Sequence, residues 1–379
     1  MRYIEAFRDR DLAAGLAGAI AREAGDAREF AFMEFCGGHT HAISRYGVTD
    51  LLPANVRMVH GPGCPVCVLP VGRIDMAIEL ALSRPEVMLC SYGDCLRVPA
   101  SGGRSLLRAR AQGADVRMIY SPADALQLAR AHPEREVVFF AIGFETTTPP
   151  TAAVLLAARA AGVRNFSVIC NHVLTPAAMQ RILEHTAEEA DGGGAAVRID
   201  GFIGPAHVST VIGSRPYEVF ATHYRKPVVI AGFEPLDVMQ AVRMLLRQVR
   251  SGQARVENEF TRAVTRDGNR KAQALVAQVF ELRESFEWRG LGPLPDSALR
   301  IREGWAEWDA ERRFALAYRP VPDHRACDCG EILRGRKQPA DCRLFATVCT
   351  PQNPKGACMV SSEGACAAHY NYGRFRDVA

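Results

Sequence analysis

The sequence predicts an α/β protein in which two parallel-sheet domains face a cleft and a small, irregular C-terminal domain follows. Between about residues 28 and 250, short apolar runs alternate with helical stretches, which is the pattern of βαβ units. The runs are apolar at successive positions, as in strands buried on both faces of a parallel sheet. From Arg319 onward the chain is rich in Cys, Gly and Pro. A segment with so few core residues is expected to be held together by a cofactor.

The N-terminal segment is expected to form an amphipathic helix. Its apolar residues return at helical spacing, namely Ile4, Phe7, Leu12, Leu16 and Ile20. Acids and bases occur throughout the segment, so it does not resemble a signal peptide. The longest apolar stretch, residues 137–144, is far shorter than a membrane span. We therefore expect a cytoplasmic protein with no membrane contact.

The predicted strands follow in order, and each ends at a polar or glycine-rich loop. They are the apolar runs at residues 30–35, 56–60, 87–90, 116–120, 137–142, 166–170, 199–203 and 227–233. One large sheet or two smaller ones would accommodate them. The chain length and the break at residues 133–136 favour two domains. The predicted division is residues 1–132, 133–254 and 255–379, the last comprising a helical connection and the cysteine-rich domain.

Residues 255–318 are expected to be mainly helical, with charged residues on the surface. Three tryptophans, Trp288, Trp305 and Trp308, lie in this segment and are interpreted as core residues. In parallel α/β sheets, ligands bind beyond the carboxyl ends of the strands. The residues that follow the predicted strands are therefore the first place to look for chemistry.

Twelve cysteines are the unusual feature of the composition. In a reducing compartment, many cysteines indicate metal binding or redox chemistry more often than structural disulfides. Cys36 opens a CGGHTH loop, and Cys64 and Cys67 form a CxxC in a GPGCPVC loop. A lone CxxC is ambiguous among a redox pair, a zinc site and chance, but a second Cys/His-rich loop nearby favours a functional site. His39 and His41 are either ligands or residues that hydrogen-bond loop carbonyls.

A second group of cysteines lies in the C-terminal segment: Cys327, Cys329, Cys342, Cys349, Cys358 and Cys366. Four thiolates can hold a [4Fe–4S] cluster or a structural zinc ion. Zinc sites usually use closely spaced CxxC pairs, which this segment lacks, so the wide spacing favours a cluster. Two of these cysteines are then spare, and Cys327 competes with Cys329 while Cys358 competes with Cys366.

Polar residues follow other predicted strands: Asp94, Glu145, His172, His207 and Glu234. Each alone is better interpreted as a helix cap or loop hydrogen-bonder. Together, on one rim, they would line a polar cleft. A further three cysteines lie in or at the end of apolar runs and are interpreted as small buried residues: Cys90, Cys95 and Cys170.

Charge and missing motifs exclude several functions. The net charge is only +4, and no basic cluster indicates nucleic-acid binding. The sequence contains no GxxxxGK[ST] loop, no GxGxxG opening a helix after a strand and no GxSxG elbow. Nucleotide binding and acyl transfer therefore have no support.

Taken together, the motifs resemble those of the HypD family of [NiFe] hydrogenase maturation factors. The resemblance runs from about residue 30 to the C-terminus, through FCGGHTHAI, HGPGCPVCVLP, GDCLRVP, GFETTTPPTA, DGFIGPAHVSTVIG and the cysteine-rich tail. It implies two α/β domains, a [4Fe–4S] domain, and a scaffold role in building the Fe(CN)₂CO moiety of the hydrogenase active site. It also implies HypC as a partner, HypE as cyanide donor, and the hydrogenase large subunit as an indirect partner.

Residue by residue, the resemblance assigns iron binding and redox chemistry to Cys36, Cys64 and Cys67. It assigns the cluster to Cys342, Cys349, Cys366 and one cysteine of the CxC pair, for which Cys329 is chosen. Cys358 is then spare.

The GD and SSEG motifs add Asp94 and Glu363 as functional residues by the same resemblance. The sequence departs from the family pattern at Cys95, where an apolar residue is expected, and at Ala206, where glycine is expected. Neither departure removes a candidate ligand. Two other functions remain open: a dithiol oxidoreductase similar to ferredoxin:thioredoxin reductase, and a zinc-stabilised adaptor.

Overall fold

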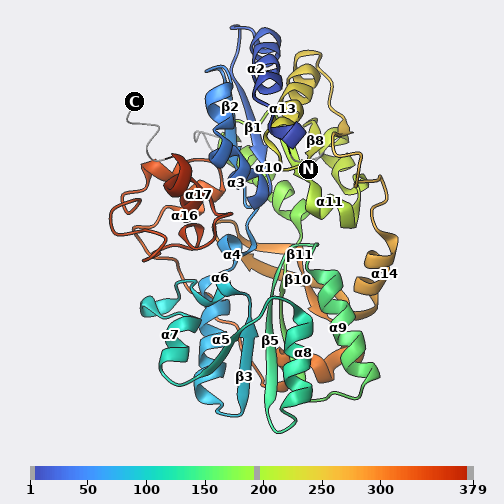
Figure 1. The fold of residues 1–379 in the computed structure, drawn as a ribbon, viewed down its shortest axis with the longest axis vertical. Helices are drawn as coiled ribbons and strands as arrows, with labels where there is room; N and C mark the ends of the chain where they lie inside the picture. The colour runs from blue at the N-terminus through green and yellow to red at the C-terminus, as the bar shows by residue number, and fades with distance from the viewer. Residues whose placement is uncertain (1–4, 192–196, 374–379) are drawn as a thin grey trace.

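Two separate parallel sheets organise the chain, and the computed structural model describes residues 5–191 and 197–373 (Figure 1). The first sheet has the order β2-β1-β7-β8-β9 and the second the order β4-β3-β5-β6. The strands of the first sheet are β1 (Phe30–Glu34), β2 (Val56–His60), β7 (Gly201–Pro205), β8 (Val228–Ala231) and β9 (Val256–Asn258). Those of the second are β3 (Val87–Ser91), β4 (Asp115–Met118), β5 (Glu136–Gly143) and β6 (Phe166–His172). The predicted fold class is confirmed, and every predicted run forms a strand.

The sheets do not divide at residue 132, so the predicted domain boundary is wrong. β7 pairs in parallel with β1, with Phe32 opposite Gly201. Residues 201–258 therefore return to the first sheet, whereas residues 87–172 form the second. The apolar pattern marks each strand but carries no information about which neighbour it pairs with. The prediction assumed that strands close in sequence share a sheet.

Helices cover the faces of both sheets (Figure 1). Those associated with the first sheet include α2 (Arg10–Ala24), α3 (Gly37–Tyr46), α11 (Ala206–Ile212), α12 (Glu218–Thr222) and α13 (Pro235–Arg250). Those around the second sheet include α5 (Val71–Ser83), α6 (Gly93–Leu96), α7 (Leu106–Ala111), α8 (Pro122–Ala131) and α9 (Thr148–Ala160). The remaining helices are α4 (Pro65–Val68), α10 (Thr175–Asp191), α14 (Arg270–Val279), α15 (Ala310–Arg313), α16 (Cys329–Leu333) and α17 (Ala365–Ala368). Within the described part of the chain, no helix has the length and apolar character needed to cross a membrane.

The predicted N-terminal helix exists but begins later than expected. α2 begins at Arg10, because the Asp9 side chain caps it by accepting two backbone N–H groups at 2.9 Å. Phe7 lies before it in a short 3-10 turn, and Ile4 lies outside the described residues. Ile20 is fully buried against the first sheet, whereas Leu12 is 60% exposed, so the apolar face is narrower than predicted.

The predicted helical connection at residues 255–318 is largely a β-hairpin. β10 (Phe280–Trp288) pairs antiparallel with β11 (Gly292–Ile301), and α14 precedes it. The burial of β10 is irregular and only partly alternating, so its pattern indicates a strand weakly. The interpretation of the tryptophans is confirmed, since Trp288, Trp305 and Trp308 are 1%, 6% and 7% exposed.

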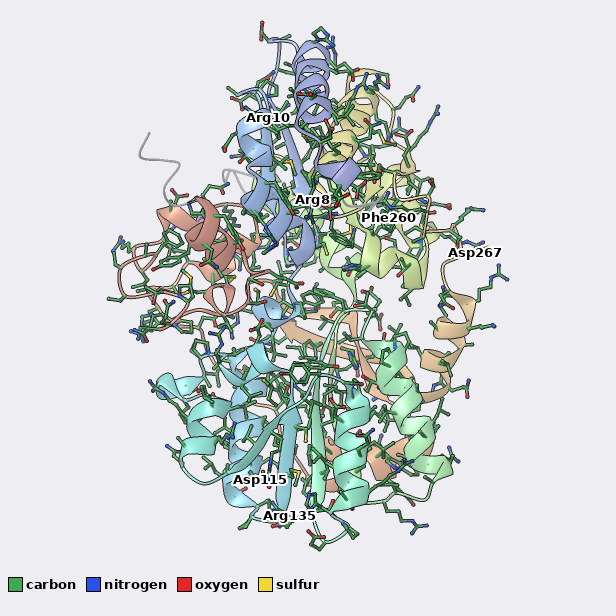
Figure 2. The ribbon with its side chains drawn as sticks, in the orientation of Figure 1. Arg8, Arg10, Asp115, Arg135, Phe260 and Asp267 are labelled. Carbon is green, nitrogen blue, oxygen red and sulfur yellow. A yellow bond between two sulfur atoms is a disulfide. The ribbon has the colours of Figure 1, made fainter. Side chains whose placement is uncertain are left out.

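Charged residues also tie the elements together. At the far end of the second sheet, Asp115 of β4 pairs with Arg135 at 3.2 Å (Figure 2). Deeper in the molecule, Glu311 of α15 accepts hydrogen bonds from Arg73 of α5 at 2.6 Å and from Arg283 of β10 at 2.8 Å. Arg73 is only 2% exposed. The Glu311 carboxylate therefore fastens the hairpin to the helix that covers the second sheet.

We expect Glu311→Gln to lower the free energy of unfolding by about 3 kcal/mol at pH 7, because it leaves two largely buried guanidinium groups without a carboxylate. Burial alone would raise the pKa of Glu311, but Arg73 and Arg283 lower it to about 2. Since this folded-state pKa lies below the unfolded one, the stabilisation is present above the unfolded pKa and is lost as the pH falls toward 2. Denaturant unfolding of both proteins at pH 7 and pH 3 should show the difference shrinking at pH 3.

Glu281→Gln is a matched control, because the Glu281–Arg300 pair on the same hairpin is exposed. Its effect should stay within about 0.5 kcal/mol at both pH values. An equal loss of stability for Glu311→Gln at pH 7 and pH 3 would contradict the assignment.

Candidate functional site

A cavity of about 490 Å³ lies where the loops after strands of both sheets meet the C-terminal domain. Its walls include Cys36 after β1, Asp94 after β3, Thr147 after β5, His207 after β7, and Glu363 of the C-terminal domain. These are carboxyl ends of parallel strands, which is where the fold class places ligand sites. The predicted cleft between the two sheet domains is therefore present, and it holds several of the predicted site residues.

Cys36 lies two residues after the end of β1 and is the N-cap residue of α3. Burial, followed by the charges of Glu363 and Glu34, raises the pKa of its thiol, and the backbone N–H groups of Gly38 and His39 oppose that shift. The Glu363 side chain lies directly on Gly37, where an added Cβ would be 2.8 Å from Glu363 Oε2. The glycine after Cys36 is thus required for the C-terminal domain to approach this closely.

Glu34, which the sequence analysis did not select, supports this loop from below. It is fully buried at the end of β1, and its Oε2 accepts the backbone N–H of Cys36 at 2.9 Å. Its Oε1 lies 2.9 Å from His60 Nδ1 and accepts the hydroxyl hydrogen of Thr40. A carboxylate inside the otherwise apolar run FAFMEF was the available signal, because a buried charge needs several partners.

The CxxC motif lies where the chain passes from the first sheet to the second. α4 carries the motif and lies between the two halves in Figure 1. Cys64 is 3% and Cys67 0% exposed, and both are free thiols. Burial, followed by the neighbouring Cys64, raises the pKa of Cys67. Gly63 touches the backbone of Cys36, and Gly37 donates a hydrogen bond to Gly63 O at 3.0 Å. The two cysteine loops are therefore in contact.

We expect Gly63→Ala to lower the free energy of unfolding by about 1–3 kcal/mol, because the new Cβ would lie 2.6 Å from Cys36 Cα. Backbone atoms in a packed loop cannot move aside as a flexible side chain can. Gly15→Ala in α2 is the control, since nothing lies within 4 Å of its added Cβ, and it should raise the stability by about 0.5–1 kcal/mol. Equal effects of the two changes in urea unfolding would contradict the close contact.

Asp94 and Glu363 face the same cavity from opposite domains. Burial, followed by the charge of Asp94, raises the pKa of Glu363. Asp94 also lies 3.5 Å from Arg97. The structure therefore brings these two predicted residues together with Cys36.

The three histidines near the cysteine loops lie in different surroundings. His39 is fully buried, and its Nε2 hydrogen-bonds to the carbonyls of Ala231 at 3.0 Å and Gly232 at 2.9 Å. It is the loop-stabilising residue that one of the two interpretations described. His207 lines the cavity, with its ring 4.0 Å from that of Phe233. His41 of α3 lies against the C-terminal domain, with its Nδ1 3.4 Å from the carbonyl oxygen of Ser362.

Glu145 and His172 do not line the cavity, so their predicted place on its rim is wrong. Glu145 is 5% exposed and accepts hydrogen bonds from the backbone and hydroxyl of Thr175. Its pKa is raised by burial to about 7. His172 is fully buried, with Nε2 3.1 Å from Thr151 Oγ1, and burial lowers its pKa to about 3. Both residues join loops to helices inside the second domain.

Glu234 is also displaced from the predicted rim. It is the N-cap residue of α13, and its Oε1 accepts a hydrogen bond from Arg8 at 2.9 Å. The helix-cap interpretation is correct for this residue.

Cys90, Cys95 and Cys170 are 0–1% exposed, as expected for small buried residues. Cys95 and Ala206, at which the sequence departs from the pattern of the resembled family, are both fully buried in the core. Neither lines the cavity that holds Cys36.

The C-terminal cysteines surround a second, smaller cavity. Its walls include all of Cys327, Cys329, Cys342, Cys349, Cys358 and Cys366. Cys329 is joined to Cys358 by a disulfide, with their Cα atoms 6.2 Å apart. The choice of Cys329 as a cluster ligand is therefore corrected, because its sulfur is bonded to the cysteine that was predicted to be spare. The free thiols are Cys327, Cys342, Cys349 and Cys366.

These four thiols fit a cluster. All four line the same small cavity, and burial, followed by Cys327, Cys349 and Cys342, raises the pKa of the Cys366 thiol. Gly356 lies against Cys327, because a Cβ added at Gly356 would clash with the Cys327 sulfur.

Across the described residues, no three His, Cys, Asp or Glu side chains are arranged to hold a single metal ion.

The two cysteine regions touch each other. Cys67 Sγ lies 3.9 Å from the carbonyl oxygen of Ala357, the residue before Cys358. An added Cβ on Gly364 would lie 3.0 Å from Cys67 Sγ and would strike the Cys358 backbone. The CxxC motif therefore packs against the segment that carries the Cys329–Cys358 disulfide, and this disulfide lies at the four-thiol cavity.

Comparison with known proteins agrees with this arrangement. A family model named HypD, described as the hydrogenase formation hypA family, matches residues 11–373. The chain is 68% identical to the hydrogenase maturation factor HypD of Cupriavidus necator, over 100% of this chain and 99% of the relative. It is 65% identical to HypD of Rhizobium leguminosarum bv. viciae, over 100% of this chain and 97% of the relative. It is 48% identical to HypD of Escherichia coli, over 91% and 90% of the two chains.

Proposed function

The chain belongs to the HypD family of hydrogenase maturation factors, and from that premise we propose that it is the scaffold on which iron receives the ligands of the Fe(CN)₂CO moiety. One observation carries the proposal: a single cavity brings Cys36, Asp94, His207 and Glu363 together from separate segments. The buried Cys64–Cys67 pair lies directly behind it, since Pro65 and Val66 form part of the wall. Iron is the cargo of this site.

The Cys36 thiolate lines this cavity, and a thiolate is a soft ligand that suits electron-rich iron. We assign Cys36 and a cysteine from a HypC-type partner to hold the iron, with Cys64 or Cys67 as a further ligand before the pair is oxidised. A thiol must lose its proton to bind metal. The carboxylates of Asp94 and Glu363 face the same cavity and are the groups at hand to accept that proton.

Cyanide delivery needs electrons, and the CxxC pair supplies them in this proposal. A thiocyanate group on a HypE-type donor takes up two electrons and one proton to give a thiol and cyanide. Oxidation of the Cys64 and Cys67 thiols to a disulfide releases two electrons and two protons, so the reaction yields hydrogen cyanide at the iron site. The contact between Cys67 and the residue before Cys358 offers a neighbouring dithiol/disulfide couple for exchange.

A [4Fe–4S] cluster would be held by Cys327, Cys342, Cys349 and Cys366, and when bound it supplies single electrons. The cavity that these cysteines line fits this assignment. Cys329 and Cys358 form the disulfide beside it.

A dithiol oxidoreductase that acts on other proteins is the second candidate, favoured by the CxxC motif and the adjacent disulfide. The scaffold is favoured because the pair lies behind a cavity that also holds Cys36, Asp94 and Glu363, and a general dithiol oxidoreductase has no use for these residues.

The proposal is tested on anaerobic protein purified with a HypC partner. We expect infrared bands of iron-bound cyanide and CO, together with iron and acid-labile sulfide for one cluster. Stoichiometric zinc without sulfide, or a complex that carries no cyanide bands, would exclude the scaffold function.

We expect His207→Ala to reduce the cyanide bands of that complex by about ten- to a hundredfold, because His207 lines the cavity and can donate a hydrogen bond to a ligand nitrogen. Burial, followed by the charge of His39, lowers the pKa of His207, so its ring is neutral at pH 7. The His207 side chain is exposed in the first turn of α11, so the thermal midpoint should hardly change. His132→Ala, on the surface of the second domain, is the control. Full cyanide bands in the His207 variant would mean that His207 has no part in ligand delivery.

A further inference from the structure

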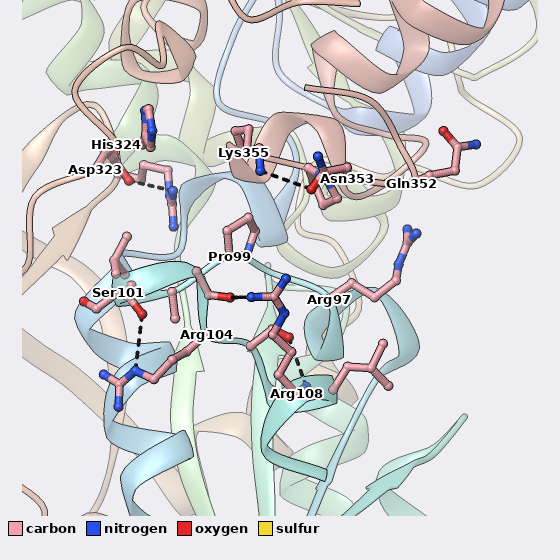
Figure 3. A pocket seen from close by; sticks show the side chains of 18 of the residues that line it. Arg97, Pro99, Ser101, Arg104, Arg108, Asp323, His324, Gln352, Asn353 and Lys355 are labelled. Carbon is pink, nitrogen blue, oxygen red and sulfur yellow. Dashed lines mark hydrogen bonds and ion pairs between the residues drawn. The ribbon is translucent and has the colours of Figure 1, made fainter. Parts of the chain in front are cut away.

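A larger cavity, of about 580 Å³, lies between the second-sheet domain and the cysteine-rich domain and is separate from the iron site. Its walls come from three stretches of chain: residues 97–108, residues 322–324 with Arg289, and residues 351–355. Figure 3 shows Arg97, Arg104 and Arg108 on one side, with His324 and Lys355 on the opposite side. Two domains thus contribute to one surface hollow to which the proposed function gives no role.

The lining of this hollow is strongly basic. Among the described residues that line it, the cations are Arg97, Arg104, Arg108, Arg289 and Lys355, and the only carboxylate is Asp323. Part of this charge is neutralised internally, since Arg289 pairs with Asp323 at 2.6 Å, Arg104 with Asp75 at 2.5 Å and Arg97 with Asp94 at 3.5 Å.

Two cations of the lining keep an uncompensated charge. Arg108 donates to the carbonyl of Gly103 at 2.6 Å, and Lys355 Nζ donates to Asn353 Oδ1 at 3.1 Å. Neither has a carboxylate partner among residues 5–191 and 197–373. A single-sign charge in a hollow attracts an oppositely charged partner over a distance of several ångströms, in a salt-dependent way.

Small apolar groups accompany the charges. Leu107 is 47% exposed, and prolines from both domains line the hollow, namely Pro99, Pro322, Pro351 and Pro354. A few rigid apolar contacts ringed by charges are typical of small, short-lived protein interfaces. A small-molecule pocket is instead mainly apolar and closed around its ligand.

One wall of the hollow contacts a cysteine of the four-thiol cavity. Residues 351–355 form one of its walls, and the backbone N–H of Lys355 donates a hydrogen bond to Cys349 Sγ at 3.3 Å. Cys349 in turn lines the four-thiol cavity. A protein bound in the hollow would therefore lie one short loop away from a proposed cluster ligand.

We propose that this basic hollow docks the acidic face of a small one-electron carrier protein, which reduces the cluster through the 351–355 loop. The inference rests on the cluster assignment made under the proposed function. In each encounter the carrier loses one electron and the cluster gains it. Two encounters, with two protons from water, suffice to reduce one disulfide to two thiols.

The test uses the full chain with its cluster, mixed in a stopped-flow instrument with a reduced plant-type [2Fe–2S] ferredoxin as the acidic probe. The double variant Arg108→Glu with Lys355→Glu should lower the second-order rate constant for cluster reduction by about ten- to a hundredfold at low ionic strength. The wild-type rate constant should fall steeply with added salt, and the variant should lose most of that dependence.

Arg110→Glu with Arg130→Glu is the matched control, because it changes the net charge equally at exposed positions outside the hollow. Its rate constant should stay within about twofold of wild type. Equal rate constants for the Arg108/Lys355 variant and this control would overturn the proposal. So would micromolar binding of inorganic phosphate or ATP that the Arg108/Lys355 variant abolishes, since the hollow would then be a small-anion site.

Docking is also measured without the cluster, by calorimetric titration of the cluster-free chain with the oxidised ferredoxin. We expect weak, salt-sensitive binding that the Arg108/Lys355 variant loses and the control variant keeps. If iron and sulfide are absent from the native protein, the cluster assignment fails while this titration still decides the docking surface. If the cluster is present but ferredoxin binds both variants alike, the docking surface alone is wrong.

Discussion

Cys64→Ser should abolish hydrogenase maturation, by at least about a hundredfold, while the C-terminal cluster stays in place. A serine hydroxyl is a hard, poorly acidic group, so it replaces a thiolate neither as an iron ligand nor as a redox partner. Cys64 lies against the Cys36 loop through Gly63 and interacts with Cys67, so the change removes one member of a connected set. The cluster cavity is built by other residues and should be unaffected.

The measurement is hydrogenase activity in a strain that depends on this protein, together with iron and sulfide content of the purified variant. Cys36→Ser and Cys67→Ser should give the same result. Cys90→Ser is the matched control, because Cys90 is fully buried in the second sheet and outside the cavity. It should reduce stability and leave maturation largely intact. Normal maturation by the Cys64 variant would exclude the proposed iron and redox site.

Cys327→Ala should remove the cluster, whereas Cys329→Ala should keep it. Cys327 is a free thiol in the four-thiol cavity, while Cys329 is bonded to Cys358. Loss of one of four ligands leaves an iron open to water and oxygen, so the iron content should fall from about four per chain to below one. Visible absorption and iron and sulfide analysis of anaerobic protein measure the outcome.

The two cysteines lie two positions apart, so the pair is its own control for local disturbance. Cys358→Ala should resemble Cys329→Ala, since both break the same disulfide and leave the four thiols intact. Retention of a full cluster by Cys327→Ala together with its loss in Cys329→Ala would restore the original sequence-based choice. Loss in both variants would mean that the disulfide itself is needed to form the cavity.

The strands and the positions of the cysteine loops could be read from the sequence alone, because both leave a local pattern. A strand buried on both faces needs a continuous apolar run, and runs such as residues 137–142 and 166–170 satisfy that requirement without reference to the rest of the chain. The position of Cys36 and of the CxxC directly after such runs likewise placed them at a sheet edge. The separate cysteine-rich tail was visible for the same reason, as an abrupt change of composition.

Tertiary structure alone decided which distant segments meet. The pairing of β7 with β1 depends on matching faces more than a hundred residues apart, and it overturned the division at residue 132. The hairpin at 280–301 formed where helix was expected, because packing on the second domain outweighs a weak local pattern. The contact of buried Glu34 with His60, the ion pair of Glu234 with Arg8 and the Cys329–Cys358 disulfide also join residues that are far apart in the sequence. A sequence shows what each residue is able to do, but only the folded chain brings a particular partner within contact distance.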